Sequence, residues 1–163
     1  MKNEDKLSLA CRILGRRSMS LQELNDALTA KGISPEAAAE TCARVSELGL
    51  ANDLEYARTL VRRYSARMQG RTAIRVRLRA HGLDAADIEE ALSEWEPDYD
   101  GLLQLLMMRF EGETDYHTVQ KAGNLLYRRG FSSDEIKQAL AYYVDAAVSS
   151  DDDDFPGFPD DDD

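Results

Sequence analysis

A four-residue pattern recurs three times along this chain of 163 residues. In each copy a basic residue or histidine precedes a glycine, an apolar residue follows, and serine or aspartate comes next. The copies occupy residues 31–34, 81–84 and 129–132, so their glycines lie 50 and 48 residues apart. A nearly constant period of this length is the signature of a repeat architecture. Each copy should therefore mark the same point in a recurring structural unit.

The pattern is typical of a boundary between two helices. Glycine adopts the left-handed conformation that closes a helix, and a cation before it suits the negative end of the helix dipole. Serine or aspartate then caps the next helix by accepting from its free amides. Ser34 is followed by Pro35, and Ser132 by Glu135 at capping-box spacing. One helix is therefore predicted to end, and another to begin, at each glycine.

Each interval between the glycines has room for a third helix. Apolar residues recur at helical spacing over 7–16, 54–68 and 99–110, and no run alternates as a strand would. The fold class expected is all-α, with three tandem three-helix repeats at 7–50, 53–96 and 98–147. Because units of this size have small cores, neighbouring repeats should bury surface against one another. We expect an elongated array, either straight or curved.

Charge is distributed unevenly along the chain. The formal net charge is −11, but the last thirteen residues, DDDDFPGFPDDDD, contribute −8. Residues 54–81 carry eight arginines against one acid, and residues 82–97 carry six acids and no base. Such separation bears on partners rather than on the fold. The middle repeat is therefore expected to be basic, and residues 148–163 to form a disordered acidic tail.

Several function classes lack their usual sequence signals. The chain has no apolar run long enough for a membrane span and no signal peptide, so a cytoplasmic location without membrane association is expected. The two cysteines, Cys11 and Cys42, lie on apolar helical faces and are predicted to be core residues. His81 and His117 are far apart, which argues against a metal site. We find no phosphate loop or catalytic motif and expect no cofactor and no enzyme activity.

The junction between the first two repeats, residues 49–92, resembles the RecX family of recombination regulators. The residues that carry the resemblance are Gly49, Leu50, Asn52, Asp53, Tyr56, Ala57, Gly70, Ile74, Leu78, Gly82, Ile88, Ala91 and Leu92. Upstream, Ser20, Glu23, Leu24, Leu28, Lys31 and Gly32 fit the preceding helix pair. The resemblance extends over residues 7–145. Tyr56 stands where phenylalanine is more usual, and the acidic tail is not part of the pattern.

The resemblance implies a function. Proteins of this family consist of tandem three-helix repeats that bind the RecA recombinase filament in its helical groove and inhibit its ATPase, strand-exchange and coprotease activities; some also bind DNA. The chain is accordingly expected to be a negative regulator of homologous recombination and of the SOS response. Its expected partners are the RecA filament and single- or double-stranded DNA, and we expect a monomer.

The arginines of the middle repeat are the candidate partner-binding and nucleic-acid-binding residues. They are Arg58, Arg62, Arg63, Arg67, Arg71, Arg75 and Arg79. Arginine binds carboxylates and phosphates in a bidentate manner and keeps its charge when partly desolvated. One interpretation is a basic face that meets an acidic partner surface or DNA phosphates. The other is a solvated face neutralised by acids of the same repeat, namely Glu89, Glu90, Glu94 and Glu96.

Alternatives remain open for both the function and the tail. The chain could be a DNA-binding regulator built from helix-turn-helix-like triplets, or a helical-repeat adaptor for another protein. The tail could serve solubility, could occupy the arginine face as an autoinhibitory mimic of nucleic acid, or could act like the terminal peptide of bacterial single-strand-binding proteins. That peptide ends in a phenylalanine, whereas this chain continues to Asp163.

Overall fold

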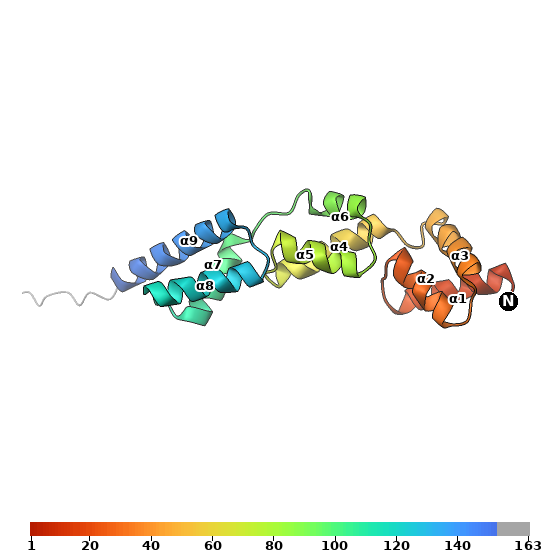
Figure 1. The fold of residues 1–163 in the computed structure, drawn as a ribbon, viewed down its shortest axis with the longest axis horizontal. Helices are drawn as coiled ribbons and strands as arrows, with labels where there is room; N and C mark the ends of the chain where they lie inside the picture. Colours follow the sequence, from red (N-terminus) through yellow and green to blue (C-terminus); the bar gives the residue numbers. More distant parts are fainter. Residues whose placement is uncertain (153–163) are drawn as a thin grey trace, which may run out of the picture. The chain divides into compact units, whose positions relative to one another are not determined.

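The computed structural model describes residues 1–152, and all regular structure in that span is helical (Figure 1). The helices are α1 (Asn3–Arg16), α2 (Leu21–Ala30), α3 (Pro35–Glu47), α4 (Asp53–Ala66), α5 (Arg71–Ala80), α6 (Ala85–Leu92), α7 (Tyr99–Phe110), α8 (Tyr116–Arg128) and α9 (Ser133–Asp152). They form three successive three-helix groups. The prediction of an all-α fold with three three-helix repeats is confirmed.

The helices fall into two compact units. The first contains Met1–Arg67 and Arg71–Glu96, and therefore α1 to α6. The second contains Met68–Gly70 and the chain from Pro97 onward, with α7 to α9. The repeat boundaries at 7–50, 53–96 and 98–147 stay predictions.

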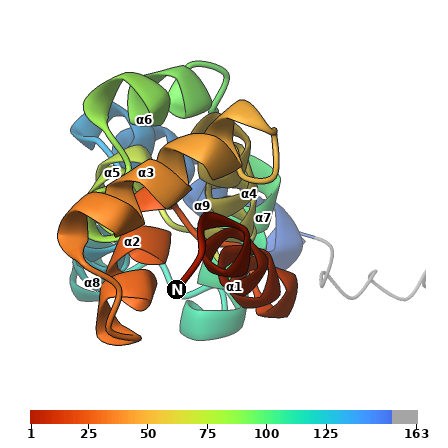
Figure 2. The ribbon, with the colours of Figure 1, turned by 90° about the vertical axis from the view of Figure 1, so that its right-hand side faces the viewer.

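Each repeat has its own small core. In the first, α3 lies across α1 and α2 (Figure 2), and Leu24, Leu28 and Val45 are fully buried. In the second, α4 packs mainly on α6 and also on α5. The side chains that fill this second core are Leu60, Ile74, Leu78, Ile88 and Leu92.

In the third repeat α9 packs against both α7 and α8. The buried Tyr143 of α9 also donates its hydroxyl hydrogen to the carbonyl of Glu113, at 2.8 Å, in the loop after α7. The core therefore combines apolar packing by Leu102, Leu106 and Leu126 with one buried hydrogen bond to the backbone.

The glycine turns have the geometry that the repeated pattern predicts. Gly32, Gly82 and Gly130 have φ values of +91°, +79° and +93°. In each turn the residue after the glycine is buried and donates its N–H to a carbonyl five residues earlier, as Leu83 does to Leu78 at 3.4 Å. These contacts satisfy carbonyls that the end of a helix leaves free. The local turn chemistry thus determines where six of the helices end or begin.

The caps of the following helices are also present. The side chains of Ser34 and Asp84 accept from backbone amides three residues on, and Ser132 forms a reciprocal capping box with Glu135. Ser20 and Glu23 form the same box at the start of α2. The Ser20 side chain is fully buried, so this cap also lies inside the packed interior.

Two local expectations differ from the structure. Cys42 is buried as predicted, but Cys11 is exposed, because it lies about 100° around α1 from the buried Ala10. The helix α9 continues through residues 148–152, where the hydroxyls of Ser149 and Ser150 donate to carbonyls one turn earlier. The remainder of the predicted acidic tail, 153–163, lies outside the described residues.

Candidate functional site

The seven candidate arginines lie on or next to two adjacent helices of the first unit. Four belong to α4 and its C-cap: Arg58, Arg62, Arg63 and Arg67. Three belong to α5: Arg71, Arg75 and Arg79. Because both helices also bury apolar stripes against each other and against α6, the guanidinium groups are confined to the flanks of those stripes. The structure therefore places some of them beside α6.

One side faces the acidic helix α6. Arg75 forms a bidentate pair with Glu89, with Nε–Oε1 at 2.7 Å and Nη2–Oε2 at 3.3 Å. This hydrogen bonding raises the pKa of Arg75 and lowers that of Glu89. Arg58 contacts Glu55 at 2.8 Å within α4 and Glu90 of α6 at 3.9 Å. For Arg58 and Arg75, acids of the same repeat therefore supply counter-charges.

A shallow groove runs along the α4–α6 side. Its volume is about 560 Å³, and its lining includes Arg58 and Arg62 from α4 together with Glu90, Glu94 and Glu96. Cations and carboxylates thus share the groove. A surface of this mixed character is a poorer match for a polyanion than a wholly basic one would be.

Arg71 has a structural role at the start of α5. Its guanidinium lies over the ring of Trp95, 5.3 Å from the centroid, and Nη2 donates to the Trp95 carbonyl at 3.0 Å. The Trp95 side chain is only 9% exposed, and the Arg71 guanidinium covers one face of its ring. We infer that Arg71 holds the segment after α6 against α5.

Three of the candidate arginines form no salt bridge with a carboxylate of residues 1–152, although the charge of Arg79 helps to lower the pKa of Glu89. Arg63 and Arg79 are exposed and make no hydrogen bond or ion pair to another described side chain. Arg62 is also exposed, and its Nη2 donates only to the Thr59 hydroxyl, at 3.2 Å. Arg77, which is not among the seven candidates, lies over the Tyr64 ring at 5.2 Å from its centroid. Tyr64 belongs to α4 and Arg77 to α5, so the contact depends on how the two helices pack and could not be predicted from the sequence.

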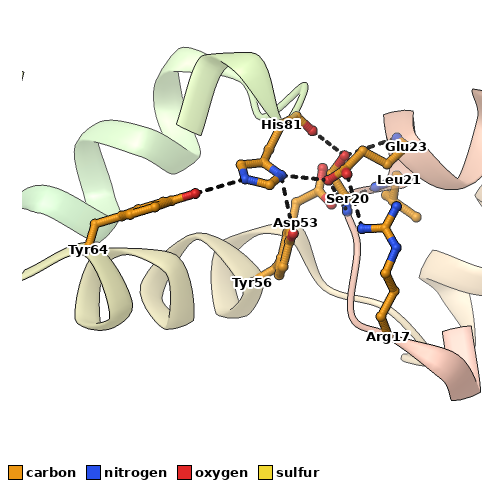
Figure 3. A network of polar contacts seen from close by, with 8 residues as sticks. All are labelled: Arg17, Ser20, Leu21, Glu23, Asp53, Tyr56, Tyr64 and His81. Carbon is orange, nitrogen blue, oxygen red and sulfur yellow. Dashed lines mark hydrogen bonds and ion pairs between the residues drawn. The ribbon is translucent and has the colours of Figure 1, made fainter. Parts of the chain in front are cut away.

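A polar network centred on His81 lies beside these arginines, where the second repeat meets the first (Figure 3). Nδ1 of His81 is 3.1 Å from Oε1 of Glu23 and 3.3 Å from the Tyr56 hydroxyl, and Nε2 is 3.2 Å from the Tyr64 hydroxyl. Because an ionised carboxylate can only accept, Nδ1 donates to Glu23. The buried Ser20 hydroxyl donates to the His81 carbonyl.

Two carboxylates in this network have opposite electrostatic environments. Burial raises the pKa of Glu23, but hydrogen bonds from the Ser20 amide and His81, with the charge of Arg17, outweigh it and lower the pKa overall. Burial raises the pKa of Asp53, and the hydrogen bond from the Leu21 amide, at 2.9 Å, only partly offsets it. The folded environment therefore stabilises the anionic form of Glu23 and disfavours that of Asp53, relative to exposed carboxylates.

Gly70 and Arg129 occupy the repeat positions that correspond to Ser20 and His81, and they also meet, within the second unit. The N–H of Gly70 donates to the carbonyl of Arg129 at 2.7 Å, just as Ser20 contacts the carbonyl of His81. A side chain at Gly70 would lie 2.4 Å from the backbone of Gly130. The resemblance motif includes Gly70, and this close backbone approach is the physical reason for a glycine there.

The described part of the chain shows neither a membrane span nor a metal-binding cluster. No helix within residues 1–152 is long and apolar enough to cross a membrane. Among the same residues no group of three or more histidine, cysteine, aspartate or glutamate side chains is placed to hold a metal ion.

Family models match most of the chain. Residues 7–44 match the model described as "RecX, first three-helix domain", residues 52–92 match the second three-helix domain, and residues 102–140 match the third. The order of the three models is the order of the three helix groups. The resemblance to the RecX family is thereby confirmed.

Curated relatives and solved structures agree with these matches. The chain is 36% identical over 147 residues to the regulatory protein RecX of Stenotrophomonas maltophilia strain K279a, covering 88% of this chain and 90% of the relative. It is 35% identical over 144 residues to the same protein of Xanthomonas campestris pv. campestris strain B100, covering 86% and 89%. The crystal structure of RecX from Lactobacillus salivarius superposes with a TM-score of 0.78 at 23% identity, covering 88% of this chain and 97% of that one.

Proposed function

Since the chain belongs to the RecX family of regulatory proteins, we propose that it is a negative regulator of homologous recombination and of the SOS response. It binds the RecA–DNA filament as a monomer in the cytoplasm and inhibits the filament's ATPase, strand-exchange and coprotease activities. It does so by occupying a surface rather than by catalysing a reaction. The family membership supports the choice of partner, because RecX relatives are regulatory proteins.

The observation that carries an electrostatic mechanism is the set of exposed arginines on the second repeat. Arg62, Arg63 and Arg79 are exposed and form no salt bridge with a carboxylate among the described residues. Such groups break no internal salt bridge when they meet DNA phosphates or acidic side chains. They are the proposed primary contacts.

The remaining candidates are proposed to act differently. Arg58 and Arg75 already contact acids of their own repeat, and Arg71 stacks on Trp95. These three contribute positive potential but are less available for new bidentate contacts. Arg67 lies at the C-cap of α4, next to the left-handed Met68, and is retained as a contact residue on position alone.

A charge-reversal variant tests this proposal. We would titrate Arg62→Glu/Arg63→Glu/Arg79→Glu into RecA that hydrolyses ATP on single-stranded DNA. The triple variant should need about tenfold or more protein for half-maximal inhibition, because the contacts with phosphate or carboxylate become repulsive. A circular dichroism melt confirms folding.

A matched control makes the same change in net charge elsewhere. Arg12, Arg109 and Lys137 are exposed and lie on α1, α7 and α9. Their simultaneous change to glutamate should leave inhibition near the wild-type level. Full inhibition by the Arg62/Arg63/Arg79 variant, or equal losses in the two triple variants, would remove the proposed basic-surface mechanism.

The autoinhibitory role of the tail stays a proposal and has its own test. A chain that ends at Asp152 retains α9 and lacks only residues 153–163, with six of the eight aspartates of the C-terminal run. If the tail competes for the arginines, its removal should tighten binding to RecA–DNA filaments at low salt. Unchanged affinity would leave a solubility role or the resemblance to the single-strand-binding peptide.

A further inference from the structure

Helix α8 presents two tyrosines to solvent on one face. Tyr116 is 82% exposed and Tyr127 is 75% exposed. They are 11 residues apart, which is about three helical turns, so they point in nearly the same direction about 16 Å apart along the axis. Single exposed aromatic residues are common, but two that share a face form a possible binding surface.

The remainder of this face is polar or basic. Gln120 and Asn124 are exposed between the tyrosines, and Lys121 and Arg128 are exposed along one edge. The helix from Tyr116 to Arg128 contains no aspartate or glutamate. The preceding Asp115 uses both carboxylate oxygens to accept from Thr118. We call these six residues of α8 the tyrosine face.

The fold does not require aromatic residues at these positions. When the three repeats are aligned on Gly32, Gly82 and Gly130, Tyr127 corresponds to Thr29 and Arg79. The opposite face of α8 supplies the core contacts through Ala122, Leu125 and Leu126, as the apolar faces of α2 and α5 do. The exposed face of α8 is therefore free to serve a purpose other than stability.

The corresponding helices also differ in charge and aromatic content. Helix α2 carries Glu23 and Asp26 and no base, whereas α5 carries four arginines and no aromatic residue. Of these three helices, only α8 combines aromatic rings, side-chain amides and cations. The combination matches single-stranded nucleic acid, in which the bases are unstacked and the phosphates are negative.

We propose that the tyrosine face binds single-stranded DNA directly, without RecA. Tyr116 and Tyr127 stack on bases, Gln120 and Asn124 contact base edges, and Lys121 and Arg128 contact phosphates. The inference goes beyond the proposed function, because it assigns a DNA contact to named residues of the third repeat, away from the candidate arginines. It adds a second nucleic-acid contact to the arginines of the second repeat.

The test is fluorescence anisotropy of a fluorescein-labelled oligothymidine titrated with the full chain at low salt. Tyr116→Ala/Tyr127→Ala should weaken binding about tenfold or more, because stacking on each base is lost. Tyr116→Phe/Tyr127→Phe should retain most of the affinity, since the rings remain. The control is Met108→Ala on α7, which shortens a side chain that is 84% exposed and should leave affinity unchanged.

The salt dependence tests the cations independently. Lys121→Gln/Arg128→Gln should make the slope of log affinity against log salt shallower by about 1.4, or about 0.7 for each phosphate contact on a single strand. An unchanged slope would contradict the assignment of these two residues to phosphates.

Three results would overturn the proposal. The first is a wild-type chain that does not bind the oligonucleotide, and the second is a tyrosine-to-alanine variant that binds it normally. The third is loss of RecA inhibition by that variant with unchanged oligonucleotide affinity, which would indicate a protein partner. The RecA ATPase assay of the arginine variants is separate, so the two proposals can fail independently.

Discussion

Nδ1 of His81 lies 3.1 Å from Oε1 of Glu23, although the two residues are 58 positions apart in the chain. Glu23 also completes the capping box of α2, so one carboxylate serves both the local helix start and the contact between the first two repeats. His81 in turn contacts Tyr64 of its own repeat through Nε2. The imidazole therefore couples the cap of α2 to the core of the second repeat.

Removal of the imidazole should destabilise the first unit. We expect His81→Ala to lower the free energy of unfolding by about 1–3 kcal/mol, because Glu23 and the two tyrosine hydroxyls lose a partner in a half-buried site. Urea denaturation measures the change. His117→Ala, at an exposed position on α8, should change stability by less than about 0.5 kcal/mol, and equal effects would contradict the role of His81.

The contribution of Glu23 should depend on pH. Its folded-state pKa lies below the ordinary value of 4.5, so its stabilising effect is complete above that value and is lost as the pH falls through the folded-state pKa. Glu23→Gln should therefore be less stable than the wild type at pH 7, and the difference should shrink in acid. Urea midpoints measured from pH 7 down through the folded-state pKa of Glu23 test this expectation. The control is Glu40→Gln, at an exposed position.

The negative charge of Asp53 should affect stability in the opposite direction to that of Glu23. Burial raises its pKa, so ionisation costs stability in the folded state and the cost disappears as the pH falls below the folded-state pKa. Asp53→Asn keeps an acceptor for the Leu21 amide without the charge, and should be at least as stable as the wild type at pH 7.

The alanine variant separates the acceptor from the charge. Asp53→Ala removes both, and should lose about 1–3 kcal/mol because the Leu21 amide is left without its acceptor. Thermal unfolding of the two variants compares them directly. If asparagine and alanine destabilise equally, the hydrogen bond to Leu21 does not contribute as inferred.

The glycine turns should differ in their tolerance of alanine. An alanine at either Gly32 or Gly82 would adopt a positive φ, which costs about 1–2 kcal/mol. At Gly82 the added methyl would also lie 2.7 Å from Cβ of Gln22, whereas no atom lies within 4 Å at Gly32. Gly82→Ala should therefore lose about 1–3 kcal/mol more than Gly32→Ala, measured by urea denaturation. Equal losses would show that α2 can move away from the turn.

The acidic side of the second repeat illustrates how far the sequence could predict the site. The alternation of an arginine-rich stretch with an acid-rich one left two interpretations open, and one of them placed Glu89 and Glu90 near the arginines. It did not indicate that Glu89 would pair with Arg75 in a bidentate manner, or that Arg77 would cover Tyr64. Helical periodicity gives the direction of a side chain from its own axis, but the facing residue depends on how two axes cross.

The sequence by itself determined the helices, their caps and the three glycine turns, because a turn or a cap depends on residues within about five positions of each other. It also determined the family through the order of those local features. Only the tertiary structure decided that His81 meets Glu23, that Gly82 abuts Gln22, and which candidate arginines form salt bridges with acids of residues 1–152. Those relationships depend on the relative orientation of packed helices, which is set by the complementary shapes of whole surfaces and not by any short segment.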